Sequence, residues 1–240
     1  MRLRRGGGAL KFENSTSAES RQFKNQNLKI KTPIALAIHS PLPVGERWRG
    51  ALTIKRMKTF FNVNDLGNLQ QALAEAQEVK NNRFGFQHLG KNKTLLMIFF
   101  NNSLRTRLST QKAAMNLGMN VIVLDVNAGA WKLETERGVI MDGDKSEHLL
   151  EAIPVMGSYC DLIGIRSFAG LTDREFDYAE TIVNQFVKYS GRPVFAMETA
   201  TVHPLQAFAD LITIEEHKTV ARPKVVLSWA PHCRALPQAV

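Results

Sequence analysis

Five consecutive residues, Ser103-Leu104-Arg105-Thr106-Arg107, bring two hydroxyl groups and two guanidinium groups together directly after an apolar run. Guanidinium groups bind phosphate through paired, charge-assisted hydrogen bonds. If the run is a strand and the five residues open a helix, free backbone N–H groups and the positive end of the helix dipole act on the same point. The segment therefore predicts an anion site suited to phosphate. The alternative, which spacing alone leaves open, is a serine N-cap followed by solvated arginines.

Polar side chains also follow two later apolar runs. Arg166 and Ser167 follow the run at 162–165, and His203-Pro204-Leu205-Gln206 lies shortly after the run at 194–197. Ligands of open parallel sheets bind outside the carboxyl ends of the strands, so we expect the three segments to converge. Taken alone, Arg166 also suits a surface charge, and a histidine before a proline also suits a helix cap.

The elements that must position these side chains follow from the hydrophobic pattern. From Met57 onward, apolar runs of strand length alternate with amphipathic segments of helical length, which predicts an α/β fold with helices flanking a parallel sheet. We expect strands at 94–100, 121–124, 162–165, 194–197 and 224–229. We expect helices at 66–79, with a cap at Asn64-Asp65, and at 108–117, 146–156 and 173–188.

The strand expected at 224–229 is followed by little chain, although a βα architecture needs further elements to bury it. We therefore expect the chain to be truncated at its C-terminal end. The expected parts are a basic extension at 1–56, an α/β domain at 57–215, and at 216–240 the start of a second α/β domain.

The net charge of +9 comes from one end of the chain. Residues 1–56 hold 12 Lys+Arg and 3 Asp+Glu, so the remaining 19 basic and 19 acidic residues of 57–240 balance. Because this first segment is punctuated by Gly and Pro and shows no helical or strand period, we expect a non-native or disordered extension. The alternatives are an organelle transit peptide and a basic arm that binds nucleic acid. A nucleic-acid-binding arm would have more aromatic residues among its charges, so we expect no nucleic-acid partner.

Composition excludes two further classes. The chain is 44% hydrophobic but has no run of 18 apolar residues that could span a bilayer, so we expect no membrane partner. Two cysteines are too few for a disulfide scaffold. Cys160 suits a core position, and we expect Cys233 to be incidental although it follows His232. The cysteine pattern favours a reducing compartment, the cytoplasm.

In combination, the segments resemble the carbamoyl-phosphate site of the aspartate and ornithine carbamoyltransferases. The motifs are Ser103-Leu104-Arg105-Thr106-Arg107, Arg166 and His203-Pro204-Leu205-Gln206, in this order on successive strand ends. The resemblance covers nearly all of 57–240 and none of 1–56.

Two other stretches look most like the N-acylornithine branch, the N-succinyl- and N-acetylornithine carbamoyltransferases. These are Asn127-Ala128-Gly129-Ala130-Trp131-Lys132-Leu133-Glu134, and Trp229-Ala230-Pro231-His232 with the following Leu236-Pro237-Gln238-Ala239-Val240. The resemblance implies carbamoyl transfer from carbamoyl phosphate to the free amine of an N-acyl-L-ornithine, giving N-acylcitrulline and phosphate in arginine biosynthesis.

The resemblance also implies roles for individual residues. The catalytic pair would be Arg105, which neutralises the phosphate with Arg166, and His203, which donates to the carbamoyl oxygen. Gln206 would hold the carbamoyl nitrogen. The residues implied at carbamoyl phosphate are Ser103, Leu104, Arg105, Thr106, Arg107, Trp131, Arg166, His203 and Gln206. No metal, cofactor or covalent intermediate is implied.

Trp131 is implied to reach the site of a neighbouring subunit in a homotrimer; without the resemblance it suits a partly buried aromatic position. In the resembled branch, one position near the acyl group is Glu in acetyl-type and Pro in succinyl-type enzymes, and register places Ser146 there. A carboxylate would repel a succinyl group, so its absence favours succinylornithine. His232 is the second implied acylornithine contact; Cys233 follows it, where the branch generally has proline.

Two alternatives stay open. A plain ornithine carbamoyltransferase shares the phosphate-site residues, although the stretches around Trp131 and Trp229 argue against it. The other is a carbamoyl-phosphate-binding fragment without turnover, because we expect most of the second domain to be missing and the chain to have little activity alone.

Overall fold

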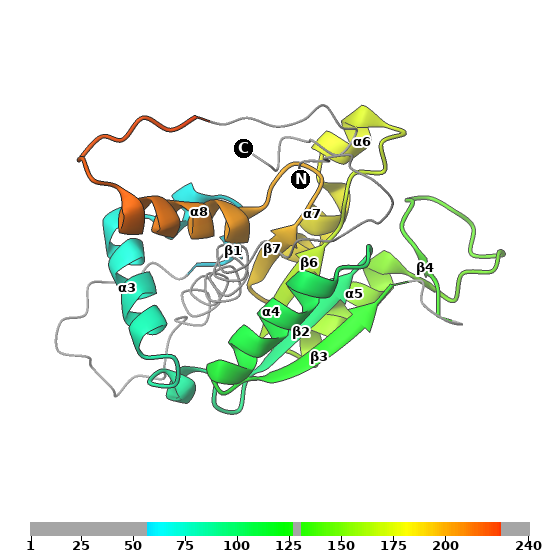
Figure 1. The fold of residues 1–240 in the computed structure, drawn as a ribbon. Helices are drawn as coiled ribbons and strands as arrows, with labels where there is room; N and C mark the ends of the chain where they lie inside the picture. The colour runs from blue at the N-terminus through cyan, green and yellow to red at the C-terminus, as the bar shows by residue number, and fades with distance from the viewer. Residues whose placement is uncertain (1–56, 127–130, 227–240) are drawn as a thin grey trace, which may run out of the picture.

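One parallel sheet lies at the centre of the computed structural model, which describes residues 57–126 and 131–226 (Figure 1). Its strand order is β1-β7-β6-β2-β3, and every neighbouring pair is parallel. The strands are β1 (Thr59–Phe60), β2 (Thr94–Phe99), β3 (Asn120–Asp125), β6 (Leu162–Arg166) and β7 (Val194–Glu198). The expected α/β class, a parallel sheet flanked by helices, is confirmed.

Helices cover both faces of this sheet. One face packs against α3 (Leu69–Asn81), α4 (Leu104–Asn116) and α8 (Pro204–His217). The other packs against α5 (Leu149–Ser158) and α7 (Thr181–Tyr189). The remaining elements are α6 (Arg174–Tyr178), the 3-10 turns η1 (Val63–Leu66) and η2 (Gln87–Leu89), and a separate pair of short strands, β4 (Leu133–Glu134) and β5 (Glu147–His148).

The strand β2 shows why its sequence is continuously apolar. Leu95, Met97 and Phe99 join the core cluster under α3, α4 and α8. Leu96 and Ile98 join the cluster under α5 and α7. A central strand of a parallel sheet is buried on both faces, so successive side chains enter two different cores.

Three helix starts differ from the sequence expectation. The first helix begins at Leu69 and is capped by Asn68, because Asn62 and Asp65 already form the capping box of η1, which ends at Gly67 with φ 70°. The helix expected to begin at Leu108 instead begins at Leu104, directly after Ser103. The helix expected at 146–156 begins at Leu149, because Glu147–His148 form the strand β5 and His148 is the N-cap.

The single helix expected at 173–188 is wrong. Two helices, α6 and α7, are separated by Glu180, whose backbone is left-handed with φ 48° and ψ 41°. The Asp177 carboxylate accepts hydrogen bonds from the backbone of Gly170 and Leu171, whereas Glu180 binds the loop after β7. Because the helix is broken, Asp177 and Glu180, three residues apart, bind two different loops.

The start of a second domain expected at 216–240 lies partly outside the described residues. Residues 224–226 form no strand with any described segment, so the first half of the strand expected at 224–229 is not formed. Residues 227–229 lie outside the described residues. The extension expected at 1–56 lies outside them as well. Within the described residues, no helix is both long enough and apolar enough to cross a membrane.

Burial in the two cores predicts unequal effects for the same substitution. Ile98 is fully buried in β2, whereas Ile122 on the edge strand β3 is 40% exposed. We expect Ile98→Ala to lower the free energy of unfolding by about 3 kcal/mol and Ile122→Ala by less than about 1 kcal/mol. Urea unfolding followed by circular dichroism measures both, and equal losses would contradict the described core.

Candidate active site at three strand ends

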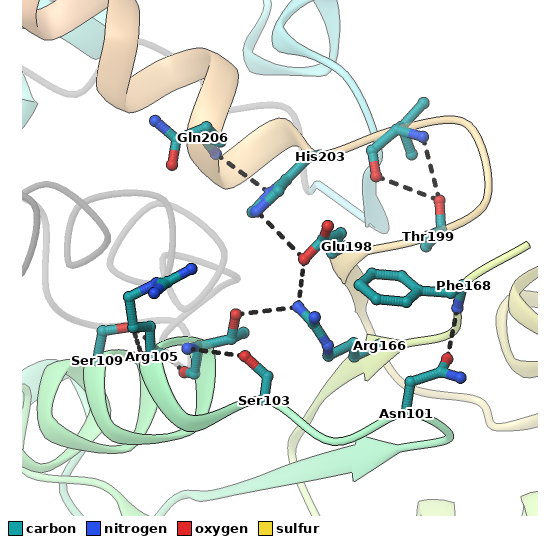
Figure 2. A network of polar contacts seen from close by, with 12 residues as sticks. Asn101, Ser103, Arg105, Ser109, Arg166, Phe168, Glu198, Thr199, His203 and Gln206 are labelled. Atoms are coloured by element: carbon teal, nitrogen blue, oxygen red, sulfur yellow. Dashed lines mark hydrogen bonds and ion pairs between the residues drawn. The ribbon is translucent and has the colours of Figure 1, made fainter. Parts of the chain in front are cut away.

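The three segments singled out in the sequence meet at the carboxyl ends of β2, β6 and β7 (Figure 2). Two hydrogen bonds fasten the loops to one another. The Phe168 N–H donates to Asn101 Oδ1 at 2.7 Å, and the Ser167 N–H donates to the Glu198 carbonyl at 3.0 Å. The expected convergence of the three segments is therefore confirmed.

The first loop ends in the N-terminus of α4. Ser103 is the N-cap, with an extended backbone, and its Oγ accepts a hydrogen bond from the Thr106 N–H at 3.2 Å. Leu104 and Arg105 are exposed in the first turn, where backbone N–H groups lack partners inside the helix. In the described part of the chain the Arg105 guanidinium has no ion-pair partner, and Figure 2 shows it in the space between α4 and α8. This geometry favours an anion.

Arg166 is the buried cation of the site, with 7% of the residue exposed. Its Nη1 donates to Thr106 Oγ1 at 3.1 Å and forms an ion pair with Glu198. Its guanidinium lies 4.2 Å from the centroid of the Phe168 ring. Burial lowers the pKa of Arg166, the Glu198 carboxylate opposes this, and Arg105 lowers it further. Of the two arginines, Glu198 pairs with Arg166 alone, so the charge of Arg105 remains available to a ligand.

Glu198 is the residue of the candidate site that the sequence did not single out. It ends β7, and its Oε2 lies 3.7 Å from His203 Nε2 as well as beside Arg166. Burial raises the pKa of Glu198, and the cations Arg166 and Arg105 lower it. Its position in the sequence could have identified it. An acidic residue at the carboxyl end of a parallel strand lies near the side chains at the carboxyl ends of the neighbouring strands.

His203 is the N-cap of α8 and is held as a neutral imidazole. Its Nδ1 accepts a hydrogen bond from the Gln206 N–H at 3.4 Å. Burial, followed by the Arg166 cation, lowers the pKa of His203 to about 4. With Nδ1 accepting, the single proton of the neutral ring is assigned to Nε2. The residue therefore offers an uncharged N–H donor near the Arg166 guanidinium.

Two other predicted residues point elsewhere. Arg107 forms an ion pair with Asp125 at the end of β3, and its guanidinium lies 4.5 Å from the Phe99 ring centroid. Gln206 Nε2 donates to Asp210 Oδ1 at 2.8 Å along α8. The Gln206 bond turns its amide nitrogen to the helix and leaves the amide oxygen as an acceptor.

Trp131 and Ser146 belong to the β4–β5 segment. The indole of Trp131 packs against the core under α5 and α7, on the other face of the sheet from α4 and α8, and its Nε1 donates to Glu147 Oε2 at 3.3 Å. Ser146 is exposed, and its backbone N–H donates to the Lys132 carbonyl at 3.0 Å. Within one chain, Trp131 is thus a partly buried aromatic. His232 lies outside the described residues.

The arrangement suits chemistry on a phosphorylated carbonyl compound. A helix N-terminus and two guanidinium groups can bind phosphate, and the neutral Nε2–H of His203 can polarise a carbonyl oxygen. Among residues 57–126 and 131–226, no group of three His, Cys, Asp or Glu side chains could hold a metal ion.

Known proteins match this part of the chain. The chain is 74% identical to an N-succinylornithine carbamoyltransferase of Bacteroides thetaiotaomicron over 184 residues, which are 77% of this chain and 58% of the relative. An N-acetylornithine carbamoyltransferase of Xylella fastidiosa is 37% identical over 77% of this chain and 55% of its own length. The chain thus spans well under two thirds of the length of these relatives.

A solved structure matches as well. It is an N-acetyl-L-ornithine transcarbamylase variant, in which one glutamate is replaced by serine, complexed with carbamyl phosphate and N-succinyl-L-norvaline. The TM-score is 0.62 at 38% identity, over 67% of this chain and 48% of that one. The family model for the carbamoyl-P binding domain of aspartate/ornithine carbamoyltransferase matches residues 58–216. The chain belongs to the aspartate/ornithine carbamoyltransferase family, and the match lies in its carbamoyl-phosphate-binding domain.

Proposed function

We propose that this chain provides the carbamoyl-phosphate site of an enzyme that carbamoylates the free amine of an N-acyl-L-ornithine, with succinyl favoured over acetyl. The products are N-acylcitrulline and phosphate, in arginine biosynthesis. The observation that carries the proposal is the meeting of the α4 N-terminus, two arginines and a neutral histidine at one point. Identity of 74% to N-succinylornithine carbamoyltransferase, against 33% to ornithine carbamoyltransferase of Pelobacter propionicus, favours the acylated acceptor.

The phosphate would lie on the first turn of α4. Backbone N–H groups at Leu104 and Arg105 would donate to its oxygens, with the Ser103 and Thr106 hydroxyls beside them. Arg105 and Arg166 would supply the positive charge. Arg107 is part of this site only when its ion pair with Asp125 opens.

The carbamoyl group would then lie toward α8. The amine attacks the carbamoyl carbon, the carbonyl oxygen becomes an oxyanion, and the His203 Nε2–H, the Thr106 hydroxyl and Arg105 stabilise it. The Gln206 amide oxygen would accept from the carbamoyl nitrogen. The bond from carbon to phosphate oxygen breaks, the electron pair leaves with phosphate, and the phosphate can take the proton that the amine loses.

Ser146 would contact the acyl group, together with His232. The support for succinyl comes from a solved acetyl-type variant with serine in place of one glutamate, whose complex contains N-succinyl-L-norvaline. Lys132 and Lys145 lie in the same segment, paired with Asp144 and Glu134. Because both lysines are already paired, the argument from this segment rests on the absence of a carboxylate at position 146, which suits a second carboxylate on the substrate.

We also propose that the enzyme is a cytoplasmic homotrimer in which Trp131 serves a neighbouring subunit's site. Within one chain, Trp131 packs on the other face of the sheet from α4. The outer face of α4 exposes three apolar side chains, Leu104 at 75%, Leu108 at 57% and Met115 at 54%. An exposed apolar stripe beside the anion site supports its burial by another subunit.

Removing one guanidinium tests the anion site. We expect Arg105→Ala to weaken carbamoyl-phosphate binding about 10- to 100-fold, because a charge-assisted hydrogen bond contributes about 1.5–3 kcal/mol. Isothermal titration calorimetry of the 240-residue chain measures this, with circular dichroism to verify folding. Arg83→Ala, at an exposed arginine in the loop after α3, is the control and keeps the wild-type affinity. Unchanged binding by Arg105→Ala would refute the site.

The neutral His203 predicts how stability depends on pH. Its pKa is about 4 when folded and about 6.5 when unfolded, so the unfolded state takes up the proton first and stability falls as the pH falls from about 6.5 to 4. Between pH 7 and pH 4.5 we expect the wild type to lose about 2 kcal/mol more than His203→Asn. Asparagine keeps the helix cap without titrating. Urea unfolding at both pH values measures the difference, and parallel losses would exclude a buried neutral imidazole.

A further inference from the structure

Glu180 holds the loop that carries His203, although it lies outside the proposed site. Its Oε1 accepts three hydrogen bonds from that loop: from Thr199 Oγ1 at 2.6 Å, from Thr201 Oγ1 at 2.7 Å and from the Thr201 backbone N–H at 2.8 Å. These contacts join the start of α7 to the connection between β7 and α8. A carboxylate is suited to this place because it is purely an acceptor and can receive several donors.

The loop held in this way is a short turn between two residues of the site. The Thr199 N–H donates to the Val202 carbonyl at 2.9 Å, and the Val202 N–H donates to Thr199 Oγ1 at 3.3 Å. Thr199 is fully buried. Glu198 directly precedes this turn and His203 directly follows it, so the turn fixes the 3.7 Å separation between their side chains.

The backbone of Glu180 indicates that its side chain is placed for this contact. Its left-handed conformation, φ 48° and ψ 41°, is unfavourable for a residue with a Cβ. Glu180 occupies the N-cap position of α7, yet its side chain caps no helix N–H. Asp173, the N-cap of α6, accepts the expected hydrogen bond from Phe176. The Glu180 side chain thus binds the β7–α8 loop instead of capping α7, and these contacts stabilise its left-handed backbone.

We propose that Glu180 is a positioning residue: its carboxylate fixes the Thr199–Val202 turn and so sets the His203 imidazole against Glu198 and Arg166. Glu180 touches neither the reacting atoms nor His203 itself. The ligand-binding part of this proposal rests on the proposed function, whereas its effect on the His203 environment does not.

The first test follows the His203 imidazole in the ligand-free 240-residue chain. The charged groups that face it are Arg166 from β6 and Glu198 from β7, and Arg105 on α4 acts on both. None is altered in Glu180→Gly, and glycine adopts the left-handed backbone without strain. We expect the His203 pKa, read from ring-proton NMR shifts against pH, to rise from about 4 by one unit or more in this variant.

Matched variants separate positioning from general stability. Leu171→Gly changes another left-handed residue, with φ 62°, which does not hold the His203 loop, and should leave the His203 titration unchanged. Thr201→Val removes one hydroxyl donor and should raise the His203 pKa by a smaller amount. Thr201→Ser keeps the donor and should restore the wild-type titration. Thermal unfolding verifies that each variant is folded at the measuring temperature.

The second test measures carbamoyl-phosphate binding by calorimetry. We expect about 10-fold weaker binding in Glu180→Gly and wild-type binding in Leu171→Gly. A folded Glu180→Gly chain with the wild-type His203 titration would overturn the positioning role, whatever its affinity. A wild-type chain that is folded but binds no carbamoyl phosphate would instead count against the proposed function, while the NMR comparison would still decide the role of Glu180.

Discussion

The rest of the site depends on the burial of one cation, Arg166. A guanidinium that is only 7% exposed needs partners, because an uncompensated buried charge is strongly destabilising. Those partners are Glu198 on β7, the Thr106 hydroxyl on α4 and the Phe168 ring in the next loop. Satisfying Arg166 therefore draws three elements together. The compensation is incomplete, since Arg105 adds a second positive charge near the same carboxylate, and this imbalance favours an anionic ligand.

The sheet places Arg166 where these partners can reach it. β6 lies between β7 and β2 in the strand order, so its carboxyl end is flanked by the two loops that begin α8 and α4. The fit between β6 and β7 is close: a Cβ added at Gly164 would lie 2.6 Å from the Phe195 ring. An alanine there would have to displace the Phe195 ring. The site thus lies at the carboxyl end of a closely packed strand pair, with Arg166 on β6 and further ligand-facing groups on the first turns of α4 and α8.

Much of this could be predicted from the sequence, and the failures have physical causes. Buried parallel strands are continuous apolar runs, so the sheet and the convergence of its strand ends followed from local pattern. The break at Glu180 did not, because the hydrogen bonds that hold it come from a loop about twenty residues later. The sequence could have predicted that Arg107 points away from the site. Arg105 points toward α8, and residues two apart on a helix do not share a face. Roles proposed for Trp131, Ser146 and His232 depend on neighbouring chains or segments, which local pattern in one chain does not define.

Arg166 also couples ligand binding to the proton state of His203. The pKa of the histidine is low first because the ring is buried and then because the arginine is positive. A phosphate bound to Arg166 would bring negative charge that opposes the second cause and leaves the first. The imidazole would stay neutral at physiological pH because it remains buried. Its N–H would become less acidic, because the phosphate offsets the positive charge of Arg166. Burial, with a smaller contribution from the cation that attracts the phosphate, therefore keeps the imidazole uncharged before binding, so the ring donates a hydrogen bond without adding positive charge beside Arg166.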